Sequence, residues 1–169
     1  SATPTGTVGA LPPPWAQVDV GTVGQAGIAT FTSGLFTSAG AGVGATSTAD
    51  AFRFVYLPVV GDCTIVARVD SLGTGGTTSR RAGVMIRQSL NANAIEAATL
   101  VGPTAIYNTR RTTVGGSTSS TSSTATPPRW VRLIRGGNTL TAAHSANGTT
   151  WTNFTARTVT MSGTVYVGL

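Results

Sequence analysis

Short β-prone segments recur along the whole chain, and breaks rich in Gly, Ser or Thr separate them. Within several segments apolar and polar residues alternate, which is the two-residue period of a strand with one buried face. This arrangement predicts an all-β fold, an antiparallel two-sheet sandwich, and argues against a parallel sheet with crossover helices. The clearest predicted strands are 51–57, 64–69, 83–88, 130–135, 139–144, 150–154 and 164–169.

Turn-forming residues identify two of the connections between these strands. Residues 136–138, Gly-Gly-Asn, predict a tight hairpin. Asn147-Gly148 predicts a second hairpin, because both residues tolerate the positive φ that such a turn needs. Two segments of low complexity, 73–79 and the Ser/Thr-rich 115–126, are predicted to be mobile loops. The alternative for the Thr-rich stretch is an edge strand that a partner covers.

The composition limits the number of domains and the class of partner. A chain of 169 residues is long enough for one domain with its own core. No apolar run is long enough to cross a bilayer, so no membrane insertion is expected. The formal charge is +6 and every basic residue is an arginine. Because the arginines are scattered from Arg53 to Arg157, we expect no nucleic-acid partner, and the charge favours solubility or attraction to acidic glycans.

Alternation along the predicted strands indicates which side chains share a face. Residues 52, 54 and 56 are aromatic and lie on one face, which we expect to belong to the core. If three of the strands belong to one sheet, Arg53, Arg68 and Arg87 line one surface, where they either meet an acidic ligand or pair with acidic residues. Trp15 and Trp151, near turns, are candidates for stacking on a sugar ring or for the core. Trp130, which lies within a strand, is expected to be at least half buried.

The residues that would carry catalysis or bind a metal are few. A glycosidase needs two carboxylates across the scissile bond, and Glu96 is the only glutamate, without an acidic neighbour in sequence. Cys63 is the only cysteine and is predicted to be a partly buried thiol, while His144 has no second ligand at metal-binding spacing. No enzymatic activity and no cofactor are therefore predicted. Calcium stays an alternative through Asp19, Asp50 and Asp62, although no loop combines several oxygen ligands.

A set of motifs resembles the concanavalin A-like β-sandwich domains of the DUF1349 kind. They are Trp15-Ala-Gln-Val-Asp19-Val-Gly21, Thr48-Ala-Asp50-Ala-Phe52-Arg-Phe54-Val-Tyr56, Gly61-Asp62, Ile65-Val-Ala-Arg68-Val69, Ala82-Gly-Val-Met-Ile-Arg87, Trp130-Val-Arg-Leu133, Gly137-Asn138-Thr139, Gly148-Thr-Thr-Trp151 and Val165-Tyr-Val-Gly-Leu169. The resemblance runs from about Leu11 to the last residue. It implies a two-sheet jelly roll spanning 12–169, usually a non-catalytic module of secreted bacterial proteins, in some cases presumed to bind carbohydrate.

The chain departs from this family at its two ends. Family members typically continue past the equivalent of Leu169 into a final strand that closes the sandwich. The last predicted strand is therefore expected to present an open acceptor edge, formed by Val165, Tyr166, Val167 and Leu169. Residues 1–11 supply a possible donor strand, whose members are Thr3, Thr5, Thr7, Val8, Ala10 and Leu11.

Two functions follow from these observations. The first is a non-catalytic extracellular structural subunit that self-assembles into a filament or surface polymer, with the arm completing the sheet of a neighbouring copy. The arm filling its own domain is the intramolecular alternative. The second function is a carbohydrate-binding, lectin-like module that contacts polysaccharide through the Trp and Arg residues named above. Both place the chain outside the cell or at its surface, and glycosylation at Asn147 or Asn153 stays open.

Overall fold

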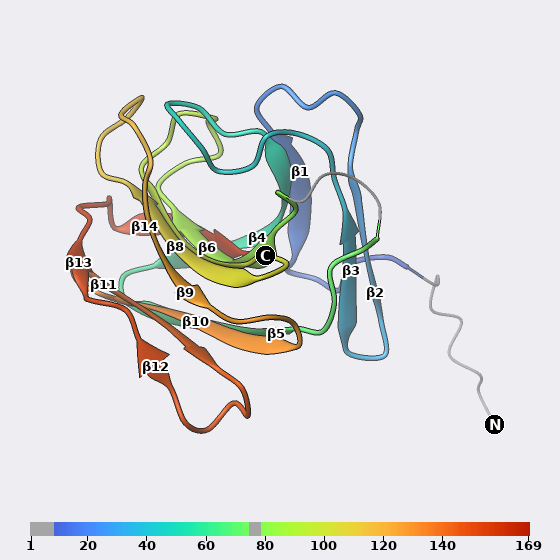
Figure 1. The fold of residues 1–169 in the computed structure, drawn as a ribbon. Helices are drawn as coiled ribbons and strands as arrows, with labels where there is room; N and C mark the ends of the chain where they lie inside the picture. Colours follow the sequence, from blue (N-terminus) through green and yellow to red (C-terminus); the bar gives the residue numbers. More distant parts are fainter. Residues whose placement is uncertain (1–8, 75–78) are drawn as a thin grey trace.

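The computed structural model describes residues 9–74 and 79–169, and the regular elements in this part of the chain are all strands. They form antiparallel sheets arranged as a sandwich, in which a five-stranded sheet packs against a curved seven-stranded sheet (Figure 1). In spatial order the larger sheet comprises β1 (Ala16–Val20), β4 (Phe52–Val60), β14 (Thr164–Gly168), β6 (Ala82–Arg87), β7 (Glu96–Val101), β8 (Ala105–Arg111) and β9 (Ser119–Thr124).

The smaller sheet and one hairpin complete the described strands. The smaller sheet comprises β12 (Thr152–Asn153), β11 (Thr139–Ser145), β10 (Arg129–Gly136) and β5 (Cys63–Val69), and β13 (Arg157–Thr158) pairs with β11 beyond β12. The hairpin of β2 (Ile28–Thr32) and β3 (Leu35–Ala39) stands beside β1 (Figure 1). The side chain of Gln17 ties it to β1, because its amide exchanges two hydrogen bonds with the backbone of Ala29.

The main core lies between the two sheets. Val84 and Ile86 of the larger sheet and Val131 and Leu133 of the smaller sheet are all fully buried in one cluster. The inward positions follow the two-residue period of each strand, so the alternation in sequence sets which residues enter the core. Burial of these apolar side chains is the principal favourable contribution to folding.

The seven predicted strands are all present, with boundaries that differ by a few residues. The turn at 137–138 is confirmed, because Gly136 pairs with Thr139 and Gly137 has a φ of 57°. Six strands, namely β1, β2, β3, β7, β8 and β13, were not predicted. The Ser/Thr-rich segment 115–126 contains β9, an edge strand, so its prediction as a mobile loop is wrong for residues 119–124.

The predicted acceptor edge is also wrong. Val165, Tyr166 and Val167 belong to β14, which pairs with β4 on one side and with β6 on the other. Leu169 exchanges two backbone hydrogen bonds with Val55. Since both sides of β14 have partners from this chain, the strand has no free edge to accept another. Of the predicted donor residues, Ala10 and Leu11 belong to no strand, and those at positions 3, 5, 7 and 8 lie outside the described residues.

The aromatic row of β4 packs in a second, smaller cluster on the outer face of the larger sheet. Phe54 is fully buried there, while Phe52 and Tyr56 keep part of their surface exposed. Tyr166 of β14 lies across Tyr56 with ring centroids 5.5 Å apart. The prediction that these three β4 residues share one packed face is therefore right, but that face points away from the main core.

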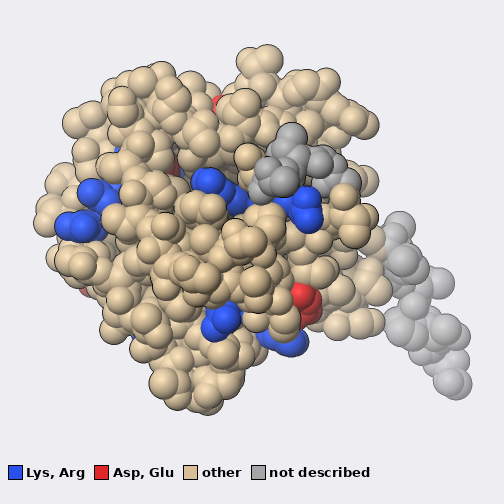
Figure 2. Space-filling model, in the orientation of Figure 1, with Lys and Arg blue, Asp and Glu red and all other residues tan. Residues whose placement is uncertain are grey.

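Two further observations concern the surface. Within residues 9–74 and 79–169, no helix is long and apolar enough to span a lipid bilayer. In Figure 2 the arginine side chains are dispersed over the visible face, with uncharged surface between them. On that face they do not gather into the compact basic patch that is typical of a nucleic-acid interface.

Candidate functional site

A groove lies where the two sheets separate along one side of the sandwich. One wall is Thr121, Ser122 and Ser123 of β9, the edge strand of the larger sheet. The opposite wall is the segment 152–155, which contains β12 at the edge of the smaller sheet. The cavity has a volume of about 250 Å³. This is near the lower end of the ligand pockets found in proteins, about 300–1,000 Å³, so it suits one small polar molecule or one residue of a longer chain.

His144 lines the groove and is the most unusual group in it. It follows Leu140 and Ala142 on the inward face of β11, so strand alternation directs its ring between the sheets. The residue is 7% exposed, and neither ring nitrogen has a hydrogen-bond partner among the residues that the structure describes. Burial and the charge of Arg129 lower the pKa of His144, which favours the neutral ring. A neutral imidazole offers one donor and one acceptor.

The other groove side chains are mostly neutral hydrogen-bonding groups. Ser and Thr hydroxyls both donate and accept, and the amide of Asn153 supplies two donors and one acceptor. Phe154 adds an apolar surface, and its ring centroid lies 5.7 Å from that of His144. The groove can therefore hydrogen-bond a hydroxylated ligand and contact an apolar face of the same molecule.

Arg157 provides the positive charge of the groove. Strand β13 places it there by pairing Arg157 with Leu140 of β11. Its guanidinium forms no hydrogen bond or ion pair with any residue that the structure describes, and its Nε atom is buried without a partner. No Asp or Glu lines the cavity. The groove thus combines neutral polar groups with one guanidinium that is available to a ligand.

The predicted tryptophans have different environments. Trp151 immediately precedes the groove wall and packs against Arg132, whose guanidinium carbon lies 4.3 Å from the ring centroid. Trp15 packs edge-on against Phe36 of the hairpin, beside β1 and at the opposite edge of the larger sheet from the groove. Trp130 is more than half buried, as predicted, and a Cβ added to Gly148 would lie 3.0 Å from its ring.

The arginine surface predicted from alternation is wrong. Arg53 faces Asp19 of the neighbouring strand and forms an ion pair of 3.2 Å with it. Arg68 lies on the other sheet, half exposed, and pairs with Asp70. Arg87 is on the opposite face of the larger sheet from Arg53 and is fully buried, so it cannot contact a glycan. Arg68 lies apart because β5 does not belong to the sheet that contains β4 and β6. Arg53 and Arg87 lie on opposite faces because Arg87 is in register, through Tyr166, with Pro58, which alternation places on the face opposite to Arg53.

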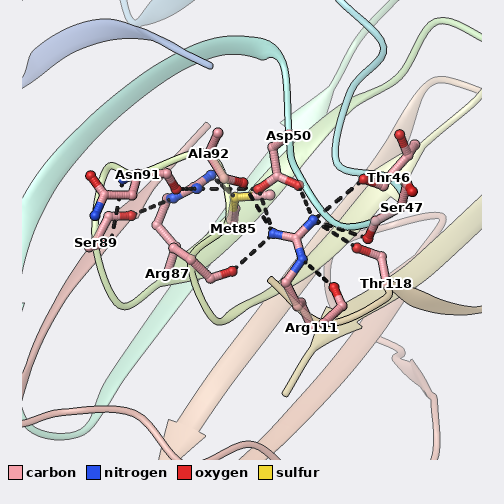
Figure 3. Close-up of polar contacts among 12 residues, drawn as sticks. Thr46, Ser47, Asp50, Met85, Arg87, Ser89, Asn91, Ala92, Arg111 and Thr118 are labelled. Atoms are coloured by element: carbon pink, nitrogen blue, oxygen red, sulfur yellow. Dashed lines mark hydrogen bonds and ion pairs between the residues drawn. The ribbon is translucent and has the colours of Figure 1, made fainter. Parts of the chain in front are cut away.

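Arg87 belongs instead to a buried charge cluster that also contains Asp50, Glu96 and Arg111. The carboxylate of Asp50 lies between the two guanidiniums (Figure 3), 3.2 Å from Nη2 of Arg87 and 3.1 Å from Nη1 of Arg111. All four residues have at most 2% of their surface exposed. Sequence analysis missed this cluster, because Asp50 and Arg111 are 61 residues apart and no local pattern connects them.

Arg111 holds three loops together at this end of the larger sheet. Its guanidinium donates hydrogen bonds to the carbonyl oxygens of Thr46, Ala94 and Gly116, each from a different loop. Figure 3 shows Thr46 and Asp50 beside this guanidinium. Glu96 lies in register between the two arginines, opposite Arg87 on β6 and opposite Arg111 on β8. Neither oxygen of Glu96 has a hydrogen-bond partner within residues 9–74 and 79–169. Burial, reinforced by the charge of Asp50, raises the pKa of Glu96 to about 8 despite the two arginines.

The structure also shows the contacts of the predicted calcium ligands and of the single thiol. Asp19 and Asp50 are engaged by arginines, and Asp62 accepts a hydrogen bond from the backbone N–H of Gly137. The three aspartates do not converge, and no group of three His, Cys, Asp or Glu residues suitable for a metal ion exists in the described part of the chain. The calcium alternative is therefore wrong for these residues. Cys63 is a partly buried free thiol, as predicted, and burial raises its pKa.

Comparison with known proteins supports the fold alone. No protein-family model matches this chain, and no curated protein matches it. Among solved structures it is similar to a functionally unknown protein from Saccharomyces cerevisiae, with a TM-score of 0.57 and 14% sequence identity over 91% of this chain and 84% of the yeast chain. At this identity the similarity confirms an all-β two-sheet architecture and carries no function.

Proposed function

We propose that this chain is a non-catalytic, extracellular carbohydrate-binding domain with a concanavalin A-like jelly roll of the DUF1349 kind. The groove between β9 and the 152–155 segment is its binding site. The observation that carries this proposal is His144, a neutral and buried side chain with two unpartnered ring nitrogens beside hydroxyl and amide groups. Unmade hydrogen bonds at buried groups cost about 1–3 kcal/mol, which a hydroxylated ligand would recover.

The carboxylates of the chain favour binding over hydrolysis. Glu96 is enclosed on the outer side of the larger sheet, and the nearest acidic residue in its cluster, Asp50, is held by two arginines. Hydrolysis of a glycosidic bond requires two carboxyl groups that reach the substrate from either side. Neither residue lines the groove.

The proposal is tested by a glycan array followed by calorimetry on the best hits. The His144→Phe variant keeps an aromatic ring beside Phe154 but removes both ring nitrogens. We expect its affinity to fall by about 5- to 140-fold, because two neutral hydrogen bonds contribute about 1–3 kcal/mol in total. Thr152→Val, which removes one hydroxyl at an exposed position, should weaken binding less.

The matched control is Tyr166→Phe, which removes one hydroxyl from the outer face of the larger sheet. It should bind like the unmodified protein. Glycan binding that survives His144→Phe but is lost in Tyr166→Phe would place the site on that face and refute the groove. Thermal unfolding of each variant separates a loss of binding from a loss of structure.

A second candidate function is self-assembly by strand donation. In this case the acceptor edge is β9, and not β14 as predicted from the sequence. Strand β9 is an almost fully exposed edge of the larger sheet, without the charges or prolines that commonly protect edges. The described chain begins at Gly9, next to Thr30 of the hairpin and thus at the opposite edge. Because Gly9 and β9 lie at opposite edges of the larger sheet, we expect a donor segment that precedes Gly9 to pair with β9 of another copy.

Deleting residues 1–8 tests this second candidate. We expect the full chain to form concentration-dependent oligomers by light scattering, and the deleted chain to stay monomeric. Ser120→Lys combined with Ser122→Lys should have the same effect, because like charges on the exposed edge oppose pairing. A full chain that is monomeric at high concentration would rule this function out.

A further inference from the structure

We infer that the groove binds a carboxylated saccharide, with the carboxylate of a uronic-acid residue held by Arg157 and the sugar hydroxyls held by the neutral groups around His144. This inference rests on the carbohydrate-binding function proposed above and specifies its ligand. It starts from the one charged side chain that lines the cavity.

The charge balance of the groove is positive. Of the described acidic residues, Asp19, Asp50 and Asp70 are paired with arginines elsewhere, and Glu96 is enclosed in the buried cluster. Asp62 lies at the turn before β5, where it binds the backbone of Gly137. No acidic residue is therefore placed to neutralise Arg157. An anionic ligand would provide the missing charge.

Arg129, which does not line the groove, adds a second positive charge that acts on His144. It lies on β10 two residues before Val131, which pairs with His144, so its side chain shares the inward face with them. Its charge already acts on His144, and it has no ion-pair partner among the described residues. An anion beside the imidazole is thus favoured by Arg129 as well as by Arg157.

The geometry of a guanidinium favours a carboxylate in particular. Its planar fork of N–H donors matches the two oxygens of a carboxylate and binds them side by side. The other lining groups are neutral and match ring hydroxyls, so one residue carrying both a carboxylate and hydroxyls fits the whole site. A hexuronate, as found in acidic polysaccharides, has this combination.

The test compares a galacturonic acid trimer with the same trimer fully methyl-esterified, because the two differ in charge and little else. By calorimetry we expect the acid to bind at least tenfold more tightly than the ester. Arg157→Gln should remove most of that difference by weakening the acid far more than the ester, and Arg157→Lys should keep a larger part of it. Raising NaCl from about 0.05 to 0.5 M should weaken only the acid. Arg68→Gln, an exposed arginine on the outer face of the smaller sheet, is the matched control and should leave both affinities unchanged.

The outcomes separate this inference from the proposed function. Equal binding of acid and ester would overturn the carboxylate inference and leave carbohydrate binding in place. A preference for the acid that is undiminished in Arg157→Gln, or is lost in Arg68→Gln, would overturn the assignment to Arg157. Failure of both trimers to bind, together with an empty glycan array, would overturn the proposed function too.

Discussion

Replacing Asp50 by Asn should remove a large part of the stability of this domain. The side chain of Asp50 is fully buried and, in the described part of the chain, is the only carboxylate that forms an ion pair with Arg87 or Arg111. Asn has nearly the same shape but no charge, so both guanidiniums keep their buried positions without an anion. Removing one partner of a buried ion pair costs about 3–5 kcal/mol. Since domains of this size are stable by about 5–15 kcal/mol, the variant should fold with little margin.

Urea denaturation measures this loss. With a slope of about 2 kcal/mol per M urea, a loss of about 4 kcal/mol lowers the midpoint by about 2 M. The matched control is Asp70→Asn, which breaks the pair between Arg68 and Asp70, whose side chains are both 49% exposed. That pair contributes about 0–1 kcal/mol, so its removal should barely move the midpoint.

Ionisation of Glu96 should offset part of the stability that Asp50→Asn loses, and this effect can be measured. The charge of Asp50 helps to raise the pKa of Glu96, so that pKa should fall when Asp50 is replaced. An ionised Glu96, in register between the two arginines, then supplies part of the missing negative charge. The double variant Asp50→Asn with Glu96→Gln should therefore lose more stability than the sum of the single variants. If Asp50→Asn costs no more than Asp70→Asn, the reasoning about the buried cluster is refuted.

Two other predictions concern pH and packing. The pKa of Glu96 is about 8 in the folded protein and near 4.5 in the unfolded chain, so the folded state binds more protons between these values. Its contribution to the free energy of unfolding should fall as pH rises from about 5 to 8, by up to about 1.4 kcal/mol per unit. Subtracting the urea-derived pH profile of Glu96→Gln isolates this slope, and equal profiles would contradict it. Gly168→Ala places a Cβ 2.0 Å from the carbonyl oxygen of Val55, and should destabilise by about 1–3 kcal/mol in thermal unfolding. Gly163→Ala, with open space around it, should be neutral; similar losses in both would contradict the packing argument.

Two of the strands that sequence reasoning missed, β7 and β8, share a physical cause. Strands β7 and β8 are buried on both faces, so their side chains do not alternate between apolar and polar. They also carry Glu96 and Arg111, charged residues that normally indicate exposure. In this fold the charges are buried because they meet one another and Asp50 across three strands. A pattern that depends on long-range partners gives no local signal.

Only part of the candidate site could be predicted from the sequence. His144 could be placed on a strand, and alternation could have directed it inward with Leu140 and Ala142. Its proximity to β9 could not be predicted, because that Ser/Thr-rich segment lacks the apolar positions that identify a strand. Trp151 was selected for its position near a turn, and it does lie next to the groove wall. Arg157 was not selected, since nothing in the sequence distinguishes it from the other arginines.

The sequence by itself determined the all-β class, the positions of half of the strands and the faces of individual strands, because the two-residue period and the turn residues act over a few bonds. Only the tertiary structure decided which strands are neighbours. It placed β14 between β4 and β6, separated Arg53, Arg68 and Arg87, and brought β9 beside β12 to form the groove. Strand pairing joins residues that are far apart along the chain, so these contacts follow from packing of the whole domain and not from any local pattern.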